Sequence, residues 1–135
     1  MYSGSEEEKK EEEYKKKVIE KGKDLVRRLE LPESEESKGY VTKSALRNLM
    51  EFAKNSKDFE EFKLKSLYLV ARNLPEGGEG PEDIRYFVTN LIIATKELSN
   101  SYPQKESLKI AGELLEVAIM AFYARYENLD KILYG

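Results

Sequence analysis

The chain has 135 residues, of which 23 are Lys or Arg and 26 are Asp or Glu, giving a formal net charge of -3. This length can bury one modest hydrophobic core but not two. Cysteine and histidine are both absent, which excludes disulfides, Ser-His-Asp and Cys-His catalysis, nearly all zinc sites and the Glu-x-x-His di-iron pattern. Abundant Glu and Lys, with Gln104 as the one glutamine, is a composition typical of thermophiles.

The first thirty residues are dominated by charge. Residues 5–13 have nothing to bury, so we expect residues 1–13 to form a charged tail that is either helical or disordered. The remainder, residues 14–135, is predicted to be a single domain. A sparse apolar stripe at helical spacing predicts a helix that ends near residue 30, and it consists of Tyr14, Val18, Leu25, Val26 and Leu29.

Two further helices are predicted in the middle of the chain. Residues 31–39 are rich in Pro, Ser and Gly and should form a loop. A helix over residues 43–55 follows, with the Thr42 hydroxyl as its N-cap. The next helix is expected over residues 57–73, with Ser56 as its cap.

Two more helices are predicted after the stretch "PEGGEGP", residues 75–81. This stretch should be a linker, because a phosphate-binding loop would follow a strand and end in Gly-Lys-Ser/Thr. The fourth helix is expected to begin at Pro81 with two acids behind it. The fifth is expected to begin near Pro103 and is apolar around most of its circumference, as a central helix or an oligomer contact would be. Residues 129–135 are predicted to add a final turn.

These elements predict an all-α fold, a compact bundle of about five helices with a charged N-terminal extension, because no run of alternating β-branched residues indicates a strand. The N-terminus has no apolar signal-peptide core, and the longest apolar run is too short to span a bilayer. We therefore expect a soluble cytoplasmic protein with no membrane partner.

Two of the predicted helices carry a line of basic side chains, each on one helical face at about 100° per residue. The line in the helix over 43–55 is formed by Lys43, Arg47 and Lys54. The line in the helix over 57–73 is formed by Lys65, Tyr68 and Arg72. Residues 41–75 hold seven basic and four acidic residues, a charge of +3, whereas residues 76–135 hold six and ten, a charge of -4.

An aromatic ring between two cations suits single-stranded nucleic acid, since the cations hold phosphates while the Tyr68 ring stacks on any base. The ordinary alternative is a solvated helix face, with Tyr68 at the edge of the core. Periodicity alone leaves both interpretations open.

The segment "TKSALRNLMEFA" followed by "FKLKSLYLVARN", within residues 41–74, resembles the small helical subunit of type III-A CRISPR effector complexes, or of a related type III system. Members of that family share a Thr-x-Ser-x-Leu/Ile-Arg helix start. A lysine-containing helix that ends in an aromatic, small residues and Ala-Arg then follows. The acidic stretch at 75–81 and the charged N-terminus depart from the family pattern.

The resemblance implies a non-catalytic subunit with no cofactor and no metal. Copies would stack head to tail, as a homo-oligomer within the complex, along the channel where guide RNA pairs with target RNA. The implied partners are single-stranded target RNA, the guide–target duplex and other type III effector subunits. The RNA-binding positions would be Lys43, Arg47, Lys65 and Arg72, with Lys54 and Tyr68 as weaker candidates. Arg47 and Arg72 lead, since a guanidinium can hold a phosphate through two hydrogen bonds.

Three other functions compete with this hypothesis. The main one is a helical protein–protein interaction adaptor with no nucleic-acid role, which docks through the apolar fifth helix. An enzyme with Glu113 and Glu116 as paired carboxylates would lack a metal signature and a second pair from another helix. A helix-turn-helix is disfavoured because its second helix would begin with three acids, where a recognition helix meets the major groove.

Overall fold

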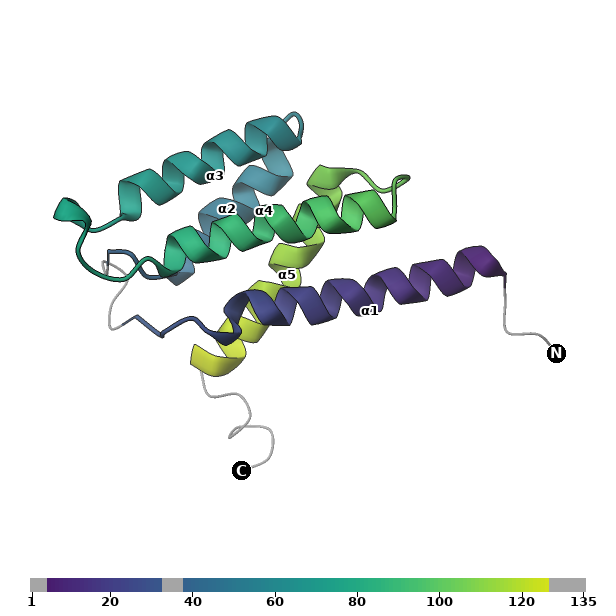
Figure 1. Cartoon of the computed structure of the whole chain (residues 1–135), viewed down its shortest axis with the longest axis horizontal. Coiled ribbons are helices and arrows are strands. Elements are labelled where there is room, and N and C mark those ends of the chain that lie inside the picture. Colours follow the sequence, from purple (N-terminus) through teal and green to yellow (C-terminus); the bar gives the residue numbers. More distant parts are fainter. Residues whose placement is uncertain (1–4, 33–37, 127–135) are drawn as a thin grey trace, which may run out of the picture.

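Five α-helices form the chain in a computed structural model that describes residues 5–32 and 38–126 (Figure 1). The helices are α1 (Glu6–Arg27), α2 (Lys43–Asn55), α3 (Phe59–Asn73), α4 (Asp83–Ser101) and α5 (Ser107–Tyr126). A short 3-10 turn, η1 (Glu76–Gly78), lies in the linker between α3 and α4. The predicted all-α bundle is confirmed, and the described ranges contain no strand.

The most apolar helix, α5, lies at the centre of the bundle. It contacts α1, α2, α3 and α4, and in Figure 1 it passes behind α1 and α4. Its fully buried side chains include Ile110, Leu114, Leu115 and Phe122, because neighbouring helices cover this face of the helix. The edge of the bundle is α3, which packs on α2 and α4 and only marginally on α5.

The charged N-terminal segment is helical from Glu6 onward. Ser5 is the N-cap of α1, and its hydroxyl accepts a hydrogen bond from the Glu8 amide at 3.2 Å. The predicted apolar stripe of α1 is buried along its whole length. Its first member, Tyr14, donates a hydrogen bond to Glu113 Oε1 at 2.6 Å. Burial and this bond raise the pKa of the Tyr14 hydroxyl above its ordinary value, so the phenol stays protonated.

The predicted start of α2 is confirmed and that of α3 is wrong by two residues. The Thr42 hydroxyl accepts from the Ala45 amide at 3.0 Å. The cap of α3 is Asp58, which accepts from the Glu61 amide at 2.9 Å. Ser56 instead ends α2, with its own amide bonded to the Phe52 carbonyl.

The last two helices begin later than predicted. In α4 the cap is Glu82 and Pro81 lies outside the helix. The start of α5 moves to Ser107, because α4 continues to Ser101 and a turn follows in which the Lys105 amide bonds to the Tyr102 carbonyl. The final turn predicted over residues 129–135 lies outside the described residues.

Gly22 marks a close approach of α1 to α5. A Cβ at this position would lie 2.6 Å from both Cβ and Cγ1 of Val117, and 3.2 Å from the Leu114 carbonyl oxygen. Val117 is β-branched and has little rotamer freedom in a helix, so it cannot swing aside. The missing side chain at Gly22 therefore sets the distance between the two helices.

We expect Gly22→Ala to lower the free energy of unfolding by about 1–2 kcal/mol, because overpacking outweighs the better helix propensity of alanine. Urea denaturation followed by circular dichroism measures the change. Gly112→Ala is the matched control, since its Cβ would meet only the Ala53 Cβ, at 3.9 Å. The control should keep or slightly raise stability, and equal losses in both variants would contradict the proposed close approach.

Candidate nucleic-acid interface

The candidate site lies where α2 and α3 form a helical hairpin. The short connection between them makes the helices antiparallel, so the start of α2 lies beside the end of α3. A hollow of about 430 Å³ opens between these two ends. Its lining consists of Lys38, Thr42, Ser44, Ala45, Asn48, Leu69, Arg72 and Asn73.

The hollow is positively charged. Its lining within the described residues includes two cations, Lys38 and Arg72, and no carboxylate. The Lys38 ammonium donates a hydrogen bond to the Arg72 carbonyl at 3.1 Å, where a cation also meets the negative end of the α3 dipole. Asn48 and Ser44 add neutral hydrogen-bonding groups beside the cations.

The exposed Arg47 side chain lies next to this hollow on α2. Residues three and four apart are neighbours on a helix surface, so Arg47 adjoins the lining residue Ser44 and precedes Asn48. Its side chain is exposed. A guanidinium here can reach an anion that is held in the hollow.

Tyr68 lies beside Arg72, one of the residues that line the hollow, on the same face of α3, as the periodicity predicts. The Arg72 guanidinium carbon is 5.0 Å from the centroid of the Tyr68 ring, a cation–π distance. The Tyr68 side chain is 64% exposed. A base can therefore stack on the ring while the neighbouring cation contacts a phosphate.

The other three predicted residues do not gather at the hollow. The Lys43 ammonium lies 5.3 Å from the centroid of the Tyr123 ring of α5, so it faces a different edge of α2. Lys65 pairs with Glu61 at 2.8 Å. Lys54 is exposed in the last turn of α2, at the opposite end of that helix.

The ion pair of Lys65 with Glu61 also affects the carboxylate. The hydrogen bond from Lys65, together with one from the Lys57 amide, lowers the pKa of Glu61. Lys65 is thus already engaged with an acid on its own helix, which makes it a weaker phosphate contact than Arg72.

Sequence reasoning missed Lys38 and Asn48 as members of the site. Lys38 belongs to the segment predicted as a loop, and its one sequence signal is that it precedes the N-cap Thr42 by four residues. Asn48 follows Arg47, but periodicity places it outside the basic line. Both enter the site only because the hairpin brings the end of α3 against the start of α2.

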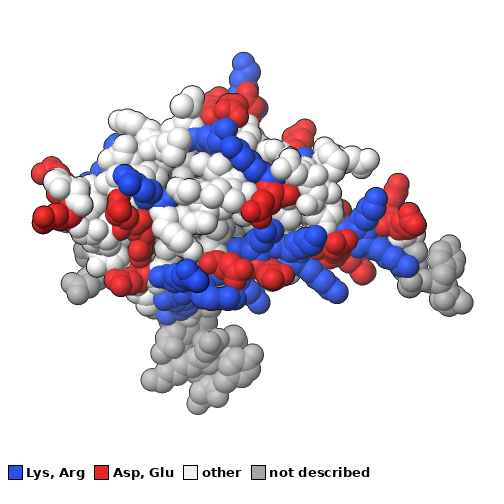
Figure 2. All heavy atoms as spheres, viewed as in Figure 1, with Lys and Arg blue, Asp and Glu red and all other residues white. Residues whose placement is uncertain are grey.

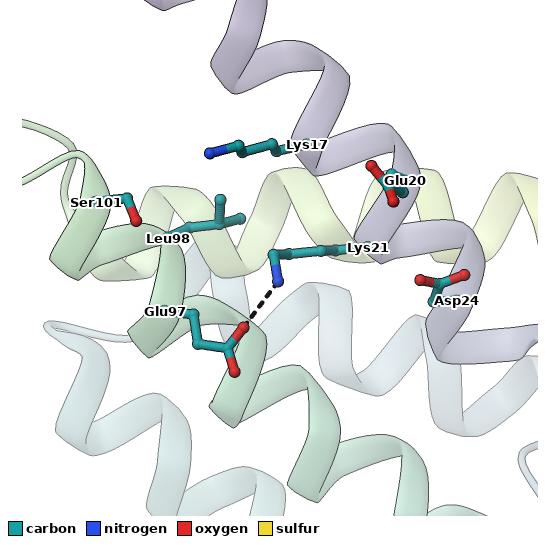
Figure 3. A pocket seen from close by; sticks show the side chains of 7 residues that line it. All are labelled: Lys17, Glu20, Lys21, Asp24, Glu97, Leu98 and Ser101. Carbon is teal, nitrogen blue, oxygen red and sulfur yellow. Dashed lines mark hydrogen bonds and ion pairs between the residues drawn. The ribbon is translucent and has the colours of Figure 1, made fainter.

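A second hollow, of about 320 Å³, lies between α1 and α4 (Figure 3). Its lining is Lys17, Glu20, Lys21, Asp24, Glu97, Leu98 and Ser101. Cations and carboxylates alternate there, and Lys21 Nζ lies 2.8 Å from Glu97 Oε2. Figure 2 shows the same mixture of blue and red along α1. With two lysines and three carboxylates, this hollow has no excess of positive charge that would attract a phosphate.

Neither a metal site nor a membrane span emerges from the described part of the chain. Its acidic side chains form no group of three or more that could hold a metal ion. Of the two carboxylates considered for catalysis, Glu113 accepts the Tyr14 hydrogen bond and Glu116 is exposed. Among the described helices, none combines the length and apolarity that crossing a bilayer requires.

No protein-family model, curated protein or solved structure matches the chain. By its fold and its site, the chain belongs to the class of small all-helical bundles. One helical hairpin of the bundle carries a positively charged hollow and an exposed tyrosine.

Proposed function

We propose that the chain is a non-catalytic RNA-binding subunit of a type III CRISPR effector complex, which contacts target and guide-paired RNA along the backbone and stacks with copies of itself. The observation that carries this proposal is the positively charged hollow between α2 and α3, beside the exposed Tyr68. The resemblance adds support, because it covers residues 41–74 and these residues form the α2–α3 hairpin that holds the hollow.

Each side chain at the hairpin has a distinct role in this proposal. Arg72 and Lys38 hold one phosphate in the hollow, and Arg47 holds the same phosphate or the next. Tyr68 stacks on a neighbouring base. Phosphates carry no sequence information, so a subunit that serves any guide needs contacts of this kind rather than base-edge hydrogen bonds.

We expect Arg47→Glu combined with Arg72→Glu to weaken binding of a single-stranded RNA of about 30 nucleotides by at least tenfold. Loss of two phosphate contacts should also reduce the slope of log K against log salt by about 1.4, at about 0.7 per contact. Fluorescence anisotropy of a labelled RNA at several salt concentrations measures both quantities. A second RNA of scrambled sequence should give the same affinities.

The matched control is Lys16→Glu combined with Lys23→Glu. Both residues are exposed on α1, and among the described helices α1 contacts neither α2 nor α3, so the control makes the same change in net charge away from the hairpin. It should bind RNA nearly as well as the wild type. Equal binding by the hairpin variant and the wild type, with both folded by circular dichroism, would overturn the site. The protein adaptor hypothesis would then be tested by a pull-down of partners.

A further inference from the structure

The outward face of α3 carries an apolar stripe with no cover in the described part of the chain. The stripe consists of Leu64, Leu67, Tyr68 and Ala71, which fall within an arc of roughly 100°. Leu64 is 71% exposed and Leu67 is 50% exposed. In Figure 2 the surface over α3 is white along much of its length, with charges gathered near the start of the helix.

The spacing of the stripe is self-complementary. Leu64 and Ala71 lie at equal distances in sequence from the point midway between Leu67 and Tyr68. A two-fold axis through that point therefore places the stripe of one copy on the stripe of another, with the two α3 helices antiparallel. This is the geometry of an isologous contact, in which the same surface serves both partners.

The charges beside the stripe fit the same antiparallel arrangement. Glu61 in the first turn of α3 and Arg72 in the last turn lie on the same flank of the stripe. In an antiparallel helix pair like flanks meet, so the Glu61 end of each copy approaches the Arg72 end of the other. In a parallel pair unlike flanks would meet, so Glu61 of one copy and Arg72 of the other would not face each other. Glu61 already forms a surface ion pair with Lys65. Such a pair contributes little free energy, so exchanging it for a pair with Arg72 of the second copy costs little.

We propose that the outer face of α3 is a self-association surface, on which α3 of a second copy of this chain docks antiparallel about a two-fold axis. A stripe of four side chains is smaller than the roughly 800 Å² per partner of a stable interface. The dimer is therefore weak, with a dissociation constant on the order of micromolar. A two-fold contact of this kind is complete with two copies, so it forms a dimer. It is distinct from head-to-tail stacking, in which further copies can be added at each end.

A functional consequence rests on the proposed function. Tyr68 and Arg72 belong both to the α3 contact and to the RNA site, so a docked second copy covers the RNA site. RNA and the second copy then exclude one another, and RNA added to the dimer releases monomers that carry RNA.

Sedimentation analysis of the whole chain without RNA tests the self-association by itself. The wild-type mass should rise from 15.6 kDa toward twice that value between about 1 µM and about 300 µM. Leu64→Glu combined with Leu67→Glu should remain monomeric. The matched control is Ile93→Glu combined with Met120→Glu, which alters exposed apolar residues of α4 and α5 and should associate like the wild type.

A charge exchange tests the antiparallel register. Glu61→Arg alone and Arg72→Glu alone should each raise the dissociation constant at least tenfold, and the two together should restore it. A monomeric wild type at every concentration, or equal loss of association in the Ile93/Met120 control, would overturn the proposal. Dimerisation without RNA binding would overturn only the proposed function, and RNA binding by a strictly monomeric protein would overturn only this inference.

Discussion

Gly39→Ala is expected to lower the free energy of unfolding by about 3 kcal/mol or more, the largest effect among the glycines that the structure describes. A Cβ at Gly39 would lie 1.9 Å from the Pro81 carbonyl oxygen and 2.9 Å from its carbonyl carbon. Both atoms belong to the backbone, so relief requires movement of the chain rather than of a side chain. The φ of Gly39 is also +86°, which costs an L side chain about 1 kcal/mol.

The hydrogen bonds of Gly39 explain why movement there is costly. Its amide donates to the Asn73 carbonyl at 2.5 Å, and its carbonyl accepts from the Ile84 amide at 2.8 Å. One residue thus joins the end of α3, the start of α4 and the segment that enters α2. Displacing Gly39 would also displace Lys38, so we expect the variant to weaken RNA binding beyond its loss of stability.

Urea denaturation measures the Gly39 effect, and Gly78→Ala is its matched control. Gly78 also has a positive φ, of +73°, but a Cβ there would meet nothing within 4 Å. The control should lose only about 1 kcal/mol, the cost of the backbone conformation alone. Similar losses in the two variants would show that conformation, and not the contact with Pro81, sets the requirement for glycine at position 39.

Arg125→Ala is expected to lower the free energy of unfolding by about 2–4 kcal/mol, since hydrogen bonds to a charged group contribute about 1.5–3 kcal/mol each and are not additive. The Arg125 guanidinium, in the last turn of α5, donates to three carbonyls at the C-terminal end of α1. Nη1 bonds to the carbonyls of Val26 and Arg27, and Nη2 to that of Leu29 at 2.7 Å. Its charge also complements the negative end of the α1 dipole.

Thermal and urea denaturation of Arg125→Ala, Arg125→Lys and Arg85→Ala would test this capping role. A lysine ammonium lacks the planar fork that reaches several carbonyls at once, so Arg125→Lys should recover only part of the loss. Arg85 pairs with Glu82 one turn earlier on the helix surface, and its removal should cost less than about 0.5 kcal/mol. A wild-type denaturation midpoint for Arg125→Ala would refute the cap.

The sequence by itself determined the helices and their inward faces. Local signals suffice where one residue type satisfies a local need, as the Thr42 hydroxyl does for the first turn of α2. The spacing of the apolar residues in α1 and the high apolar content of α5 likewise predicted that these side chains are buried. Local signals failed between α2 and α3, where Ser56 and Asp58 can both cap. In the structure Ser56 ends α2 and the Asp58 side chain caps α3.

The tertiary structure alone decided how these helices meet and what they form between them. The structural roles of Gly22, Gly39 and Arg125 depend on contacts with segments that are distant in sequence. No local sequence pattern contains those contacts. The candidate site follows the same rule. Periodicity placed Tyr68 and Arg72 on one face of α3, because helical spacing is local. The hollow that adds Lys38 and Asn48 exists only once the hairpin sets two helix ends side by side.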